Sequence, residues 1–200
     1  MDADPEENPV SPLRYFIAPI LIILLIATII PYYAIRLDPE PTGIPAPAAV
    51  LPSEIKILQG GQAIFTPEEF SELIRPSDPV IKQTADKVST ASCEGNRICQ
   101  AKALYYFVRD NFDYVSDPPN EYVKSAGETL ASGGGDCDDF AVLLANLEQA
   151  IGIRTRFVFK PGHVYIQIYL PEALKKYRKG DWVNLDPTCR SCSFGELPMH

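Results

Sequence analysis

Residues suited to nucleophilic and acid–base catalysis are few in this chain, which has five cysteines and two histidines. Four of the cysteines stand in close pairs, Cys93 with Cys99 and Cys189 with Cys192. Cys137 has no cysteine near it in sequence, and His200 is the final residue, a position where we expect mobility. If a thiol and an imidazole act together, the sequence therefore favours Cys137 and His163.

Cys137 follows three glycines and Asp136, and it precedes a predicted helix. The apolar residues with helical spacing are Phe140, Leu143, Leu144, Leu147 and Ile151. At a helix N-terminus, the dipole and free backbone N–H groups lower a thiol's pKa. We expect Asp136, Asp138 and Asp139 to cap the helix or face away from the sulfur, because their charge would raise that pKa. The alternative is a small buried cysteine beside a glycine turn.

His163 follows Lys-Pro-Gly at the start of a predicted strand, from which its ring can face a neighbouring helix N-terminus. Asp186 follows the predicted strand 182–185. If the two strands pair, its carboxylate can hold the imidazole tautomer through a hydrogen bond. Taken singly, His163 is also compatible with a structural role, and an aspartate before proline with a turn.

The two close cysteine pairs allow three interpretations. We expect two disulfides, which would indicate an extracytoplasmic domain and leave Cys137 free, although four cysteines allow three pairings. The first alternative is a zinc site of four thiolates. The second is a redox motif at residues 189–192, but this segment follows Asp-Pro-Thr rather than a strand that leads into a helix.

The apolar pattern predicts helices first and strands second. A capping box at residues 66–69 predicts a helix that ends before Pro76. Further helices are predicted at residues 79–89, from 98 to about 111, and from 137 to Gly152, which ends the helix. A loop is predicted at residues 116–120. Strands are predicted at 153–159, 164–170 and 182–185, and a short basic helix at 172–179. This order favours an α+β domain with an antiparallel sheet.

Residues 15–35 form a run of 21 residues without a charge, between Arg14 and Arg36. A helix of that length spans roughly 30 Å, the thickness of the hydrocarbon core of a membrane. The run has aromatic residues at both ends, and the residues that follow lack the small-residue exit site of a cleaved signal peptide. We therefore predict a single-pass transmembrane helix at 15–36, after a short polar head at 1–14. A buried core helix is the alternative.

Residues 37–53 are rich in proline and predict a semi-rigid linker to a folded domain at 54–200. The chain is 46% hydrophobic, enough for a core, and its net charge of −8 argues against nucleic acid as a partner. The glycines at 133–135 lack the Lys-Ser/Thr ending of a phosphate-binding loop. We predict neither a cofactor nor a resident metal.

Taken together, these motifs resemble the transglutaminase-like superfamily. Residues 134–141 with 151–156 are similar to its core motif, residues 162–166 and 182–188 to its second and third motifs, and residues 104–108 with 112–115 to its entry segment. The resemblance covers about residues 95 to 190. It implies a papain-like α+β fold, in which a helix that presents the nucleophile Cys137 packs on an antiparallel sheet that presents His163 as base and Asp186 as orienting acid.

The resemblance also implies acyl transfer, in which the Cys137 thiolate attacks an amide carbonyl and water or an amine resolves the thioester. We expect a membrane-anchored cysteine hydrolase or acyltransferase with its domain on the extracytoplasmic side. The expected activity is that of a protease or amidase on a peptide or protein substrate, with a partner protein supplying specificity. The alternatives are a non-catalytic peptide-binding or assembly module on the same fold, and an amine-accepting cross-linking transferase.

Overall fold

The computed structural model describes residues 13–64, 66–116 and 122–198, and the chain forms two units, Met1–Leu37 and Asp38–His200. Most of the predicted polar head, most of the loop predicted at 116–120, and His200 lie outside the described residues.

The first unit contains the helix α1 (Leu13–Leu37), which covers the helix predicted at 15–36. Its side chains from Tyr15 to Ile30 are exposed. Within the part of the chain that the structure describes, no helix combines the length and the apolar character needed to cross a membrane. The membrane anchor stays a prediction.

The second unit combines helices with strands, and its longer strands follow the last helix, so the mixed helix-and-sheet class predicted from the sequence is confirmed. Its elements are α2 (Pro47–Val50), β1 (Gln62–Ala63), the 3-10 helix η1 (Pro67–Leu73), α3 (Pro79–Ser92), α4 (Arg97–Asn111), β2 (Asp113–Tyr114), β3 (Tyr122–Val123), α5 (Ala126–Ser132), β4 (Gly134–Gly135), α6 (Cys137–Ala150), β5 (Thr155–Lys160), β6 (His163–Tyr169), β7 (Arg178–Lys179) and β8 (Trp182–Leu185).

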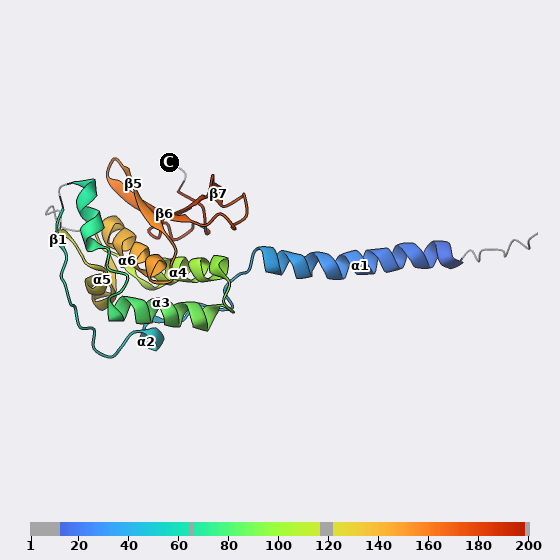
Figure 1. The fold of residues 1–200 in the computed structure, drawn as a ribbon, viewed down its shortest axis with the longest axis horizontal. Coiled ribbons are helices and arrows are strands. Elements are labelled where there is room, and N and C mark those ends of the chain that lie inside the picture. The colour runs from blue at the N-terminus through green and yellow to red at the C-terminus, as the bar shows by residue number, and fades with distance from the viewer. Residues whose placement is uncertain (1–12, 65, 117–121, 199–200) are drawn as a thin grey trace, which may run out of the picture. The chain divides into compact units, whose positions relative to one another are not determined.

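Four of the strands form an antiparallel sheet in the order β5-β6-β8-β7, with β1 and β3 as an antiparallel pair and β2 and β4 as a parallel pair. Helix α6 packs against this sheet and against α3 and α4 (Figure 1). On β6, residues 164–166 and 168 are buried, whereas His163, Gln167 and Tyr169 are half-buried. His163 is therefore the partly exposed first residue of a mainly buried strand.

Three local predictions need correction. The helix that begins at Pro67 is a 3-10 helix, and Thr66 makes no side-chain cap. Helix α5 was not predicted, although its capping box, Ser125 with Glu128, is visible in the sequence. The basic helix predicted at 172–179 is wrong, because this segment forms tight turns followed by β7, which pairs with β8. The Arg178 side chain donates to the backbone oxygen of Ala173 (2.9 Å) and holds the turns closed.

The predicted linker has contacts with the second unit from its first residues. Lys102, a fully buried lysine of α4, donates to the Asp38 carboxylate (2.5 Å). Thr42 donates through its backbone N–H and its hydroxyl to the backbone oxygen of Ser92 (3.0 and 3.2 Å). Val50 is only 3% exposed. Residues 38–53 thus contribute to the packing of the second unit.

The expectation of two disulfides is confirmed, and the structure selects one of the three possible pairings, Cys93–Cys99 and Cys189–Cys192. Sulfur atoms joined in this way are not the thiolates that zinc requires, so the four-cysteine zinc alternative is contradicted. Cys137 is the free cysteine, as predicted.

Candidate active site

Cys137 is the first residue of α6, where the sequence predicts it. The preceding backbone forms β4, in which Gly135 lies opposite Tyr114 of β2. A Cβ atom at Gly135 would lie 2.6 Å from the Cβ of Asp139, so a larger residue could not occupy this position without displacing the helix start. The Asp139 carboxylate also accepts the backbone N–H of Asp136 (3.4 Å). The glycine therefore allows the tight turn that presents the thiol.

Asp139 points into the protein and is fully buried. It accepts the backbone N–H of Lys124 (2.7 Å) and forms an ion pair with the ammonium of the same residue. Burial raises the pKa of Asp139, and the Lys124 ammonium opposes this effect. The expectation that this carboxylate caps the helix and faces away from the sulfur fits these contacts.

The structure brings His163 and Asp186 together across the β6–β8 pair. Leu185 lies opposite Ile166 in the register, and the imidazole Nε2 is 2.7 Å from Asp186 Oδ2. Asp186 is 1% exposed, and its other oxygen accepts the backbone N–H (3.2 Å) and hydroxyl (2.6 Å) of Thr188. Because Nε2 is occupied, Nδ1 is the ring nitrogen left for a second group.

Cys137 and His163 line one cavity of about 340 Å³. Val164, the residue after His163, also lines it, and its backbone N–H interacts with the Cys137 thiol. The first residue of α6 and the first two residues of β6 therefore meet at this cavity.

The surroundings of Cys137 do not produce the lowered thiol pKa expected from a helix N-terminus. Burial raises the pKa of Cys137, and the nearby Asp136 and Asp138 carboxyl groups raise it further. The backbone N–H groups of Val164 and Cys137 act in the opposite direction. Burial, together with Asp136, also raises the pKa of Asp138 to about 8. These surroundings therefore favour the neutral thiol over the thiolate.

Tyr114 is a neighbour of the thiol that the sequence alone did not single out. Its ring packs edge-on against Phe140 of α6 (6.3 Å between centroids). Burial raises the pKa of Tyr114, and negative charge on Cys137 raises it further. Its side chain also forms a hydrogen bond with Ser116, the residue is 51% exposed, and it is not among the residues that line the cavity. A protonated hydroxyl is a hydrogen-bond donor of the kind a developing oxyanion needs. Its place in the entry segment, just after the helix predicted at 98–111, was the available signal.

Three carboxylates, those of Asp136, Asp138 and Asp139, have oxygens within 4.8 Å of one another. Such a group resembles a cation site. However, the Lys124 ammonium already pairs with Asp139, and with a pKa of about 8 Asp138 is mostly protonated at neutral pH. We therefore assign no ion to this cluster.

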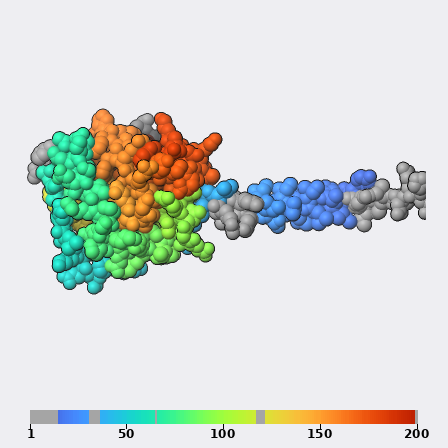
Figure 2. Space-filling view, viewed as in Figure 1, coloured from blue at the N-terminus to red at the C-terminus, as the bar shows by residue number. Residues whose placement is uncertain are grey.

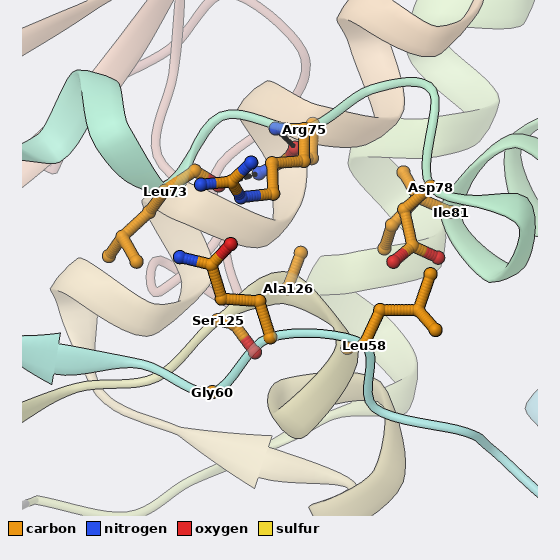
Figure 3. A pocket seen from close by; sticks show the side chains of 11 residues that line it. Leu58, Gly60, Leu73, Arg75, Asp78, Ile81, Ser125 and Ala126 are labelled. Atoms are coloured by element: carbon orange, nitrogen blue, oxygen red, sulfur yellow. Dashed lines mark hydrogen bonds between the residues drawn. The ribbon is translucent and has the colours of Figure 1, made fainter.

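A second cavity, drawn in Figure 3, lies between Leu73, Ile81 and Ser125 and has a volume of only about 20 Å³. Cys137, His163 and Asp186 are not among the residues that line it. Its volume is enough for about one water molecule. This cavity is too small to be a substrate site.

The family model of the transglutaminase-like superfamily matches residues 82–187, which is more than half of the chain and includes Cys137, His163 and Asp186. The chain therefore belongs to this superfamily, as the sequence motifs indicate. A comparison of this chain with curated protein sequences found no match.

Several solved structures have a similar fold. They include a suspected cysteine protease from Cytophaga hutchinsonii (21% identity, 62% of this chain and 43% of that chain, TM-score 0.43). They also include the periplasmic domain of TgpA from Pseudomonas aeruginosa bound to ethylmercury (20% identity, 64% of this chain and 51% of that chain, TM-score 0.42). A third is LapG from Legionella pneumophila (19% identity, 66% of this chain and 78% of that chain, TM-score 0.43). The chain spans less than half of the first of these proteins. Similarity at this level concerns the fold and assigns no activity to this chain.

Proposed function

We propose that this protein is a thiol hydrolase that cleaves amide bonds of peptides or proteins, with Cys137 as nucleophile, His163 as base and Asp186 as the group that orients the imidazole. One observation carries the proposal. His163, hydrogen-bonded to the buried Asp186, lines the same cavity as Cys137, the free thiol. Membership of the superfamily supports it further.

The surroundings of the thiol suggest the order of the proton transfers. Because the pKa of Cys137 is raised, His163 Nδ1 takes the thiol proton as the sulfur attacks the carbonyl carbon. The Cys137 backbone N–H and the Tyr114 hydroxyl would donate to the oxyanion. The imidazolium then gives its proton to the departing amine, which leaves a thioester on Cys137. Water attacks this thioester, His163 again takes the proton, and the acid product and the free thiol are released.

Asp186 holds the imidazole in the tautomer with hydrogen on Nε2 and stabilises the imidazolium. Its own position is fixed by two hydrogen bonds from Thr188. Such a preorganised base needs no rearrangement when charge develops.

Two alternatives use the same residues. The raised pKa of Cys137 favours a non-catalytic peptide-binding or assembly module. A cross-linking transferase would differ from the hydrolase only in admitting an amine in place of water to the thioester.

The deciding experiment measures cleavage of a quenched-fluorescent peptide library by the full-length chain and by the Cys137→Ala variant. We expect turnover by the wild type and only background by the variant, with Ser77→Ala, a change at an exposed residue that does not line the cavity, as the control. Turnover retained in Cys137→Ala would contradict the proposal, and no turnover in either would favour the binding module. A labelled primary amine that becomes attached to the acyl product would indicate the transferase.

We also propose that residues 15–36 anchor the protein in a membrane, with the disulfide-containing unit on the extracytoplasmic side, where disulfides persist. Alkaline carbonate should leave the full-length chain in the membrane fraction and release a chain that lacks residues 1–37. Complete extraction of the full-length chain would contradict the anchor. Protease added outside intact cells tests the orientation, because it should degrade the second unit.

A further inference from the structure

The cavity that Cys137 and His163 line is bounded by several apolar residues, here called the wall, together with Thr66, Asp138 and Lys160. The wall residues are Ile64, Pro67, Phe70, Val123 and Phe159. The volume of about 340 Å³ is at the lower end of the range for small-molecule pockets, roughly 300–1,000 Å³. It is enough for one large side chain with its backbone.

An aromatic cluster joins the two halves of this wall. The Phe70 ring of η1 packs against Phe157 (5.2 Å between centroids) and Phe159 (5.1 Å) of β5. In the space-filling view, the teal segment that contains η1 borders the orange segment that contains β5 (Figure 2). Phe70 is 7% exposed, but Phe159 is 41% exposed. Phe159 therefore offers apolar surface that a ligand can cover.

The η1 half of the wall is fixed in place. Asn146 of α6, which is fully buried, accepts the backbone N–H of Arg75 (2.5 Å) and donates to the backbone oxygen of Leu73 (3.1 Å). On the other side, Glu128 accepts the backbone N–H of Gly61 (2.5 Å), next to the β1–β3 pair. The wall is thus formed before any substrate arrives.

Three of the five wall residues, Ile64, Pro67 and Phe70, precede residue 82, where the match to the superfamily begins. The reactive residues belong to the family core, whereas much of the opposite wall comes from a segment outside it. A specificity that depends on this wall would be particular to chains that carry such a segment.

We propose that this cavity binds an apolar side chain, aliphatic or aromatic, within the two residues that precede the bond cleaved, and that Phe70 and Phe159 set this preference. The inference rests on the proposed function, since it takes Cys137 as the attacking group. An acidic side chain would be desolvated against the two rings. Lys160 also lines the cavity and could attract an acidic side chain, so the test includes a probe that carries an aspartate.

The test uses peptidyl chloromethyl ketones, which Cys137 attacks with formation of an S–C bond and loss of chloride. The two residues before the ketone are alanine, and each in turn is replaced by Leu, Phe or Asp. Rates of Cys137 modification in the full-length chain are measured by mass spectrometry. We expect Leu or Phe at one position to react roughly 10- to 100-fold faster than Asp there. Phe159→Ala should reduce this ratio of rates about tenfold, and Phe159→Lys should shift the preference towards Asp.

Val158→Ala is the matched control, because it shortens the neighbouring side chain, which faces the other side of β5. Iodoacetamide, which has no side chain to bind, should modify the wild type and Val158→Ala at equal rates. Each probe rate of a Phe159 variant is divided by the iodoacetamide rate of the same variant, which corrects for any change in the reactivity of the thiol. Equal rates for Leu, Phe and Asp probes at both positions, or equal effects of Val158→Ala and Phe159→Ala, would overturn the inference and leave the proposed function standing. Failure of the proposed function would appear separately, as an iodoacetamide rate that does not depend on His163.

Discussion

The two sides of the candidate active site differ in how well their polar groups are satisfied. On the sheet side, both Asp186 oxygens have partners, His163 on one and Thr188 on the other. On the helix side, Asp136 Oδ1 is buried without a hydrogen-bond partner among the described residues. The thiol pKa is raised there, and the pKa of Asp138 is about 8.

The His163 imidazole is thus held by a carboxylate whose two oxygens both have partners, whereas the surroundings of Cys137 favour its neutral thiol. Functional sites commonly break the rule that buried polar groups are satisfied, and the rest of the fold offsets the cost. In this chain Asp136 Oδ1 is such a group beside Cys137, whereas the other unsatisfied side chains of the described residues, Ser89, Ser92 and Glu148, lie on α3 and near the far end of α6. Four variants test the comparison, from the largest expected effect to the smallest.

Asp186→Asn should lower kcat by roughly 10²- to 10⁴-fold, because the imidazole would lose the carboxylate that holds its tautomer. Peptide turnover at saturating substrate measures this effect. The matched control is Asp181→Asn, which removes an exposed carboxylate from the turn before β8 and should change kcat by less than about twofold. Equal losses in the two variants would mean that the sheet side is not specifically organised for catalysis.

Lys124→Met should destabilise the protein by about 3 kcal/mol, since it leaves the fully buried Asp139 carboxylate without its cation. Urea unfolding of the second unit, followed by tyrosine and tryptophan fluorescence, measures this loss. Lys82→Met breaks an exposed pair with Asp86 and should cost no more than about 1 kcal/mol. If both variants unfold at the same urea concentration, the start of α6 does not depend on the Lys124–Asp139 pair.

Glu148→Met should stabilise the protein by about 1–3 kcal/mol near pH 8. Glu148 lies near the other end of α6, is fully buried, and neither carboxylate oxygen has a hydrogen-bond partner in the described part of the chain. Burial raises the pKa of Glu148 well above its ordinary value.

The folded state therefore keeps the Glu148 proton that the unfolded state loses above about pH 4.3. The contribution of Glu148 to the free energy of unfolding is therefore most favourable below that pH, and it is lost as the pH rises towards the pKa of Glu148 in the folded state. Thermal unfolding from pH 4 to 9 should show a flatter dependence for Glu148→Gln than for the wild type. Parallel curves would indicate that Glu148 is charged and paired in solution.

Asp138→Asn should have the smallest effect. At pH 9, where Asp138 is charged, removal of its charge should lower the thiol pKa and speed iodoacetamide modification of Cys137 by a few-fold, on the order of one pKa unit or less. At pH 6 Asp138 is already protonated, so the rates should agree. A variant that reacts more slowly at pH 9 would reverse the sign assigned to this carboxyl group.

Much of the second unit is predictable because its long elements have strong periodicity. The apolar spacing in α4, α6 and β6 marks the residues of each element that are to be buried, and this spacing is visible in the sequence of the element itself. The presence of two disulfides was also predictable from the cysteine count, but their connectivity comes from the structure. In contrast, the turns at 172–179 depend on pairing with β8, a contact that local composition does not encode.

The candidate active site likewise has features that the sequence predicts and features that depend on tertiary packing. The motifs around Cys137, His163 and Asp186 are visible in the sequence, and the structure brings His163 and Asp186 into contact. The raised thiol pKa could not be predicted, because it depends on how deeply α6 is buried and on where Asp136 and Asp138 point. The wall formed by Phe70 and Phe159 joins residues far apart in sequence and belongs to no local motif.

The central claim is that His163 removes the proton from the Cys137 thiol. The most direct test measures the rate of iodoacetamide modification of Cys137 between pH 4 and 9, without reductant, in the wild type and in His163→Ala. We predict that at pH 7 the wild type reacts at least about tenfold faster, and that the variant reacts appreciably only above the free-thiol pKa of ~8.5, because burial and the two carboxyl groups still raise its thiol pKa. Superimposable profiles in the two proteins would contradict the account.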